Sequence, residues 1–143
     1  MTLIEEFRTA RRVSTPLVVI RTTDAASVMA SLQDTDADGA VIQWDAAQGF
    51  AARTELGATA IAEMTGGNPQ VLNPADAMFQ LRTAPAGSIV FVMNAHRIWQ
   101  DISTAQAIWN LRDIFKSNGR TLVLLTTPEA KAPRELDSDV IVI

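Results

Sequence analysis

Short apolar segments alternate with helical patterns along most of the chain. The apolar residues in these segments are nearly continuous, which is typical of parallel strands that are covered on both faces. Five strands are predicted, at residues 16–22, 39–45, 88–94, 121–127 and 139–143. The pattern therefore predicts an α/β domain, a three-layer αβα sandwich around a mainly parallel five-stranded sheet.

Helical patterns lie before, between and after these strands. Asp24 is a predicted N-cap, Asn73 and Pro74 start another helix, and Pro85 ends it. The predicted helices cover about residues 2–12, 25–33, 73–84 and 98–117. In the last of them one inward face is predicted for Ile98, Ile102, Ala105, Ile108, Leu111 and Phe115.

Two stretches are less informative. Residues 46–72 have the composition of a helix, but their threonines and glycines also suit a hairpin insertion, and both alternatives stay open. The run "RELDSD" at residues 134–139 is interpreted as a solvated loop.

Composition narrows the class of protein. A chain of 143 residues with 48% apolar residues is long enough for one globular domain, residues 1–143. The absence of cysteine excludes disulfides, thiolate metal sites and cysteine nucleophiles. A formal net charge of −4, with Arg8, Arg11 and Arg12 as the densest basic group, disfavours nucleic acid as a partner.

The ends of the chain carry further expectations. The first residues lack the apolar core of a signal peptide, and no apolar run is long enough to span a membrane, so we expect a cytoplasmic protein without a membrane partner. The sequence stops at Ile143, inside an apolar strand. We therefore expect a longer polypeptide that continues past this residue.

The loop after the first strand lacks the residues that hold a phosphate. The stretch "RTTDAASVM" at residues 21–29 has no glycine and no lysine, and Asp24 would repel a nucleotide. Neither GxxxxGK[ST] nor GxGxxG occurs in the sequence. No cofactor is therefore expected in this chain.

The third strand, "SIVFVMN", ends without the carboxylate that would hold Mg²⁺ in an ATPase. Asn94 offers only an amide, which could position a water molecule or hydrogen-bond its own loop. His96 is the one histidine, and no residue is spaced to complete a triad or a metal site with it. No catalytic or metal-binding residue is assigned.

A candidate interaction surface is predicted where the strands end, although a helix face is an equal alternative. Open α/β sheets bind their ligands at the carboxyl ends of the strands. Tryptophan is common in protein interfaces, but the tryptophans here also suit core packing. The candidate residues are Trp44, Asp45, Asn94, His96, Arg97 and Trp99.

The order of elements resembles the core of an AAA+ ATPase without its P-loop. More closely, the chain resembles the N-terminal domain of a group of AAA+ ATPases from cyanobacteria, plastids and some phages. The resemblance is carried by "LIEEFRTARRVSTPLVVIRTTD", "VIQWDAAQGF", "NPADAMFQL", "GSIVFVMNAHRIWQD", "LRDIFKSNGRTLVLLTT" and "APRELDSDVIVI". It covers nearly the whole chain except about residues 51–70.

The resemblance implies a P-loop-like scaffold that has lost its own ATP site. ATP, Mg²⁺ and the catalytic residues would belong to an ATPase module downstream of residue 143. The first hypothesis is therefore a non-catalytic domain that recognises a substrate or adaptor protein or helps to assemble a ring, with homo-oligomers formed through the full-length parent. The alternatives are a domain that senses ATP or ADP without hydrolysis and a small α/β hydrolase or transferase.

Overall fold

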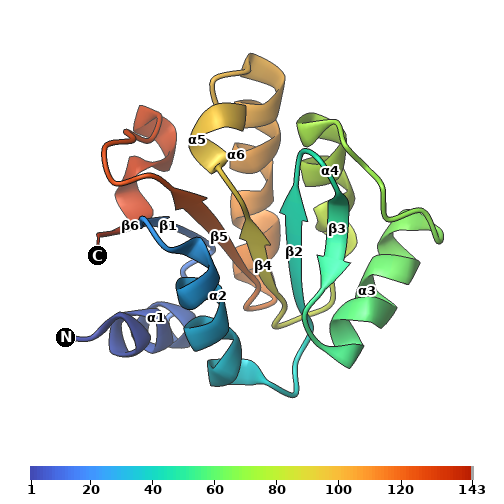
Figure 1. Cartoon of the computed structure of the whole chain (residues 1–143), viewed down its shortest axis with the longest axis horizontal. Helices are drawn as coiled ribbons and strands as arrows, with labels where there is room; N and C mark the ends of the chain where they lie inside the picture. The colour runs from blue at the N-terminus through green and yellow to red at the C-terminus, as the bar shows by residue number, and fades with distance from the viewer. Residues whose placement is uncertain (143) are drawn as a thin grey trace.

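The computed structural model of the chain describes residues 1–142, with side chains described for residues 1–136. The elements follow the order helix, strand, helix at the start, and end in a short strand (Figure 1). The helices are α1 (Leu3–Arg12), α2 (Ala25–Gln33), α3 (Glu55–Thr65), α4 (Pro74–Gln80), α5 (Ala95–Ile98) and α6 (Ile102–Ser117). The strands are β1 (Leu17–Arg21), β2 (Val41–Asp45), β3 (Gly49–Ala52), β4 (Ile89–Val92), β5 (Thr121–Thr126) and β6 (Val140–Val142). Short 3₁₀ helices are η1 (Asp34–Asp36), η2 (Leu81–Thr83) and η3 (Arg134–Asp139).

The strands form one sheet in the order β3-β2-β4-β5-β1-β6. All neighbours are parallel except β2 and β3, which form an antiparallel hairpin. The predicted α/β class is confirmed, but the sheet has six strands instead of five. The additional strand, β3, comes from the stretch that the sequence left open, and that stretch contains both a hairpin strand and the helix α3.

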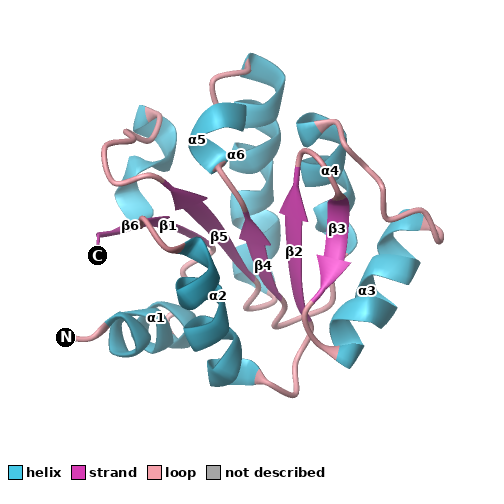
Figure 2. Ribbon diagram, viewed as in Figure 1, coloured by secondary structure: helices cyan, strands magenta, loops and turns pink. Residues whose placement is uncertain are grey.

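Helices cover both faces of the sheet, as the ribbon in Figure 2 shows. On one face Phe7 of α1 and Met29 and Leu32 of α2 pack against β1, β4 and β5. The other face is covered by α3, α4, α5 and α6, with Met78 and Phe115 among the buried side chains. The three-layer sandwich is therefore present, and it buries the central strands on both faces.

The predicted helix over residues 98–117 is wrong at its start. Asp101 accepts hydrogen bonds from the backbone N–H and the hydroxyl of Thr104, so it caps α6, and Ile98 belongs to the separate helix α5. Ile102 is 86% exposed instead of facing inward. Apolar spacing predicted one continuous face because it cannot detect a cap that restarts the helix.

The last predicted strand is found as Val140–Val142, paired in parallel with β1. Ile143 lies outside the described residues. The run predicted as a solvated loop instead forms η3, and Leu136 within it is buried against the sheet. Among the described residues no helix is both long and apolar enough to cross a membrane.

Arg11 ties α1 to the amino ends of the central strands. Its Nη1 donates to the carbonyl of Gly119 at 3.1 Å and to the hydroxyl of Thr121 at 3.1 Å. Its Nη2 donates to the carbonyl of Gly87 at 2.9 Å and to the carboxylate of Asp36 at 3.2 Å. One planar guanidinium thus satisfies acceptors from several loops, which an ammonium group could not do with the same geometry.

The helix α3 is held close to β2 by a threonine and a glycine. The Thr54 hydroxyl accepts from the backbone N–H groups of Val41 and Gly57 and donates to the carbonyl of Gly39. A Cβ atom placed on Gly57 would lie 2.3 Å from the carbonyl oxygen of Val41. Glycine is therefore required inside this helix by close packing and not by a turn.

Replacing Gly57 with alanine is expected to destabilise the fold by roughly 1–3 kcal/mol, because the helix must move away from β2. This sign is opposite to that of helix propensity, by which alanine is better than glycine by about 0.5–1 kcal/mol. Urea unfolding followed by circular dichroism measures the change. The matched control is Ala58→Gly at an exposed position of the same helix, for which propensity alone predicts the loss. A Gly57→Ala protein more stable than the parent contradicts the packing described here.

Replacing Arg11 with methionine is expected to lower the free energy of unfolding by about 2–3 kcal/mol, because buried carbonyl groups lose a charged donor. The neighbouring exposed residue provides the control, since Arg12→Met is expected to change stability by no more than about 0.5 kcal/mol. Thermal and urea unfolding of both variants measure the change in the free energy of unfolding. Equal stability of the two variants would show that the Arg11 network contributes little.

Candidate functional site

The carboxyl ends of the central strands surround a cavity of about 420 Å³, here called the carboxyl-edge crevice. The helix after β1 covers one face of the sheet, whereas the segments after β4 and β5 cover the other. Ligands of open α/β sheets bind where the connections diverge in this way. The crevice is lined by Thr22, Thr23, Ala25, Met93, Asn94, Leu125, Thr126, Thr127, Pro128 and Glu129.

The turn between β1 and α2 holds a carboxylate where a nucleotide-binding protein would hold a phosphate. Asp24 is the N-cap of α2, and its two carboxylate oxygens accept from the backbone N–H of Ser27 at 3.1 Å and from its hydroxyl at 2.8 Å. These hydrogen bonds, led by that of the hydroxyl, hold the pKa of Asp24 below its ordinary value. The positive end of the helix is thus already occupied by an anion of the chain itself.

The residues present do not fit Mg²⁺ and ATP. None of the described residues that line the crevice is a lysine or an arginine, and the turn over Thr22–Asp24 has no glycine whose amide could approach a phosphate. Within the described part of the chain, no group of three or more histidine, aspartate or glutamate residues could hold a metal ion.

Asn94 lies at the end of β4 with left-handed backbone angles, φ 52° and ψ 45°. Asparagine tolerates this conformation better than most residues. Its side chain is exposed and makes no capping hydrogen bond to α5. It lines the carboxyl-edge crevice and also a second cavity of about 350 Å³, here called the hairpin-side cavity.

The hairpin-side cavity brings three of the predicted surface residues together. Asp45, Asn94 and Arg97 line it, with Met93 and Ile98 supplying apolar wall. These three residues therefore lie around one cavity, and their role as an interaction surface stays a prediction.

Asp45 has a structural task within this wall. Its Oδ1 accepts from the backbone N–H groups of Ala47 at 2.8 Å and Gln48 at 2.7 Å, which closes the turn between β2 and β3. Gly49 ends the turn with φ 83°, and a Cβ atom there would lie 2.4 Å from the carbonyl oxygen of Pro69. The carboxylate thus shapes the rim of the hairpin-side cavity.

Two of the predicted surface residues are not on the surface. Trp44 is fully buried and donates from Nε1 to the carbonyl of Val71 at 2.7 Å, and Trp99 is only 5% exposed. Both belong to the core cluster under α3–α6. The prediction that both tryptophans lie on the surface is therefore wrong. Helices cover both faces of the sheet, so a large apolar side chain at a strand end packs against them and is buried.

His96 and Arg97 follow Asn94 on α5 and point to different surroundings. Arg97 is exposed, whereas His96 is half-buried, and its Nδ1 is buried without a hydrogen-bond partner. His96 is close enough to Glu129 to contribute to the lowered pKa of that carboxyl, behind the larger effects of its own backbone amide and the Thr127 hydroxyl.

The sequence reasoning missed the contribution of β5 and the loop after it. Thr126 and Thr127 end that strand beside Thr22, and Glu129 follows in the loop. Part of the signal was available in the sequence, because parallel strands place their carboxyl ends at one edge of the sheet. That β1 and β5 are neighbours in the sheet was the missing part. The neighbour relation itself could not be obtained from the hydrophobic pattern.

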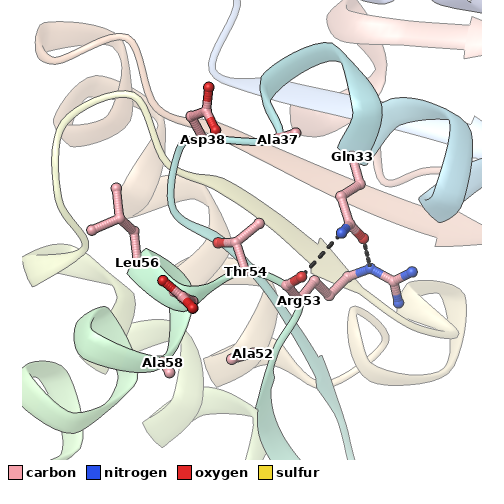
Figure 3. Close-up of a pocket in the computed structure, with 9 residues that line it drawn as sticks. Gln33, Ala37, Asp38, Ala52, Arg53, Thr54, Leu56 and Ala58 are labelled. Carbon is pink, nitrogen blue, oxygen red and sulfur yellow. Dashed lines mark hydrogen bonds between the residues drawn. The ribbon is translucent and has the colours of Figure 1, made fainter.

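The largest cavity, about 680 Å³, lies away from this edge, between the end of α2, the loop before β2 and the start of α3 (Figure 3). Arg53 extends along it toward Gln33. Arg53 Nε donates to Gln33 Oε1 at 2.6 Å, and Gln33 Nε2 donates to the backbone carbonyl of Arg53 at 3.0 Å. Arg53 Nη1 also donates to Gln43 at 2.6 Å. These contacts link α2 to the β2–β3 hairpin, so Arg53 has a structural role.

Comparison with known proteins adds the family. The model of the family described as "SpoVK-like AAA ATPase, N-terminal domain" matches residues 3–143. No protein of curated function matches the sequence.

Chains in solved structures share the fold. A chain in the structure of Drosophila ORC bound to AT-rich DNA and Cdc6 aligns with a TM-score of 0.58 at 8% identity, over 98% of this chain and 51% of that chain. Chains in Drosophila ORC bound to DNA and in Drosophila ORC bound to GC-rich DNA and Cdc6 give 0.51 and 0.53 at 10% identity. They are covered over 89% and 55% of their length, and this chain over 98% in both alignments. The present chain thus spans about half the length of two of these three relatives.

The pKa of Asp24 is expected to rise when Ser27 is replaced by alanine, because the hydroxyl hydrogen bond is the main cause of its low value. Carboxyl carbon NMR titration measures this pKa directly. Ser31→Ala on the same helix is the control and is expected to leave it unchanged. Since the folded pKa lies below the unfolded value of about 3.9, the contribution of Asp24 to stability is complete above that pH and is lost as the pH falls through the folded pKa. An unchanged pKa in Ser27→Ala would contradict the cap geometry.

Proposed function

Because the chain belongs to the family of SpoVK-like AAA ATPase N-terminal domains, we propose that it is a non-catalytic domain that recognises a substrate or adaptor protein for an AAA+ ATPase. ATP binding and hydrolysis would take place in a separate module of the parent protein. In this proposal the domain contributes a binding surface, and the motion driven by ATP acts on what it holds.

The observation that carries the proposal is the internal occupation of the phosphate position. Asp24 caps α2, and the crevice beside it has no lysine or arginine among its described lining residues. A triphosphate brought to this edge would meet carboxylates and strand carbonyls instead of amide hydrogens and an ammonium group. In this proposal the domain keeps the scaffold of a nucleotide-binding domain but lacks the glycine amides and the lysine that bind phosphate.

Protein is favoured over nucleic acid as the partner. The formal net charge is −4, and a surface that neutralises phosphates needs clustered basic residues. The ORC structures contain DNA, but an identity of 8–10% establishes the shared fold and carries no binding partner across. We therefore favour a protein bound at the edge formed by the carboxyl-edge crevice and the hairpin-side cavity.

Ring assembly is the second role that an N-terminal domain of this family could serve, with homo-oligomers formed through the parent. A cytoplasmic location belongs to the same proposal and is compatible with a sequence that has no cysteine. Neither role requires a catalytic residue in this chain.

One observation favours a different function, the sensing of ATP or ADP without hydrolysis. The carboxyl-edge crevice, at about 420 Å³, has a size within the range of about 300–1,000 Å³ that is common for small-molecule sites. It also lies where related folds bind their ligands. The charge of its rim argues against this function, and a binding experiment separates the two.

Isothermal titration of the chain with Mg-ATP and with ADP is expected to show no binding up to millimolar nucleotide. The physical reason is that the described residues lining the crevice include no lysine or arginine to stabilise the phosphate charge. Asp24→Asn tests whether repulsion alone excludes the nucleotide. Because asparagine caps helices about as well as aspartate, this variant keeps α2 intact, and it too is expected not to bind.

Phosphate release from ATP by the same samples serves as the companion measurement. Micromolar affinity for either nucleotide would replace the proposed function by nucleotide sensing. Turnover by the isolated chain that Asp45→Ala or His96→Ala abolishes would make it an enzyme.

A further inference from the structure

We propose that the carboxyl-edge crevice binds a basic side chain, an arginine or a lysine, of the partner protein. This inference rests on the proposed function and names the chemistry by which the partner would be recognised. It follows from the cavity, from the groups that line it and from the sign of the charge around it.

The wall of the crevice combines threonine hydroxyls, the Asn94 amide and the Glu129 carboxylate with the apolar side chains of Met93, Leu125 and Pro128. It lies at the carboxyl ends of β1, β4 and β5. Thr22 and Thr126 already use their hydroxyls within the protein, as acceptor and donor respectively. Thr23 and Asn94 are exposed, so they can bind a guest.

Two carboxylates give the rim its charge. Glu129 lines the crevice, and Asp24 lies between the lining residues Thr23 and Ala25. Hydrogen bonds within the protein lower the pKa of both groups, so both are ionised at neutral pH. The His96 side chain acts on Glu129 only as the last of the causes of that shift. An anionic guest is therefore disfavoured and a cationic one favoured.

The number of carboxylates distinguishes between kinds of cation. A dedicated Ca²⁺ site takes six to eight oxygen ligands and usually several carboxylates. The described residues contain no cluster of three or more metal-ligating side chains. A guanidinium or ammonium group needs fewer partners, since it brings several N–H donors of its own to carbonyl, hydroxyl and carboxylate oxygens.

The neighbouring hairpin-side cavity indicates that the cation belongs to a polypeptide. Met93 and Asn94 line both cavities, so the two lie side by side at these residues. The hairpin-side cavity adds apolar wall from Ala46, Ala47 and Ile98. A chain segment with a basic residue next to an apolar one would place the first in the crevice and the second beside it.

The test uses the whole 143-residue chain and the probe acetyl-Ala-Arg-Leu-amide, followed by amide NMR. The expected result is a set of saturable shifts at Thr22, Thr23, Asn94 and Glu129, with a dissociation constant on the order of 1 mM. The matched probes acetyl-Ala-Gln-Leu-amide and acetyl-Ala-Glu-Leu-amide are expected to bind at least tenfold more weakly.

Two protein variants complete the test. The double variant Asp24→Asn with Glu129→Gln removes the charge while keeping the N-cap of α2, and it is expected to bind the arginine peptide at least tenfold more weakly. Glu63→Gln, an exposed charge change on α3, is expected to bind it as the parent does. Amide shifts outside the crevice show that each variant is folded.

Equal binding of the glutamine peptide, unchanged binding by the double variant, or shifts confined to another face would each overturn the inference. The result is independent of the nucleotide titration. If neither the arginine peptide nor a nucleotide binds, this inference falls and the proposed protein-binding function stands. If Mg-ATP binds at micromolar concentration, the proposed function itself falls.

Discussion

The central strands β1, β4 and β5 are buried on both faces, and this burial constrains everything around them. A parallel strand cannot return by a tight turn, so each is followed by a segment that must cross over one face of the sheet. Phe7, Met29 and Leu32 fill one face, while Met78 and Phe115 fill the other. The same arrangement sends all the central strands to end at one edge, and there the polar ends of β1, β4 and β5 enclose the carboxyl-edge crevice.

What this edge can bind is decided by a few side chains at the strand ends. In a fold that elsewhere grips phosphate with backbone amides and a lysine, Asp24 uses its own carboxylate to satisfy the start of α2. Glu129 adds a second negative charge, and Asn94 lines the crevice with a neutral amide. The scaffold is thus compatible with binding, while its charge is opposite to that of a nucleotide site. A scaffold that can bind a ligand but carries the wrong charge for a nucleotide is what we expect if the domain binds protein, as proposed.

Much of the fold could be predicted because it depends on local signals. The buried strands, the caps Asp24 and Asn73, and the loss of a phosphate loop are all encoded within a few residues of each other. The prediction of one helix over residues 98–117 failed because apolar spacing does not detect the local cap Asp101, which starts α6. Distant contacts decided other features. Residues 46–72, which the sequence left open, contain β3 and α3, and Trp44 is buried with its Nε1 donating to the carbonyl of Val71. Of the predicted surface, Asp45, Asn94 and Arg97 gather at one cavity, whereas the two tryptophans belong to the core.

The sequence by itself determined the α/β class and the absence of the GxxxxGK[ST] and GxGxxG motifs, and it predicted an interaction surface at the carboxyl ends of the strands or on a helix face. These follow from residue types and their spacing, which need no knowledge of which strands are neighbours. Only the tertiary structure decided the strand order, and with it the meeting of Thr22, Thr126 and Glu129 around one crevice. It also decided that Arg11 joins loops from across the sheet and that Gly57 lies against Val41. The physical reason is that such contacts join residues far apart in the chain, and a local pattern carries no record of which distant atoms will meet.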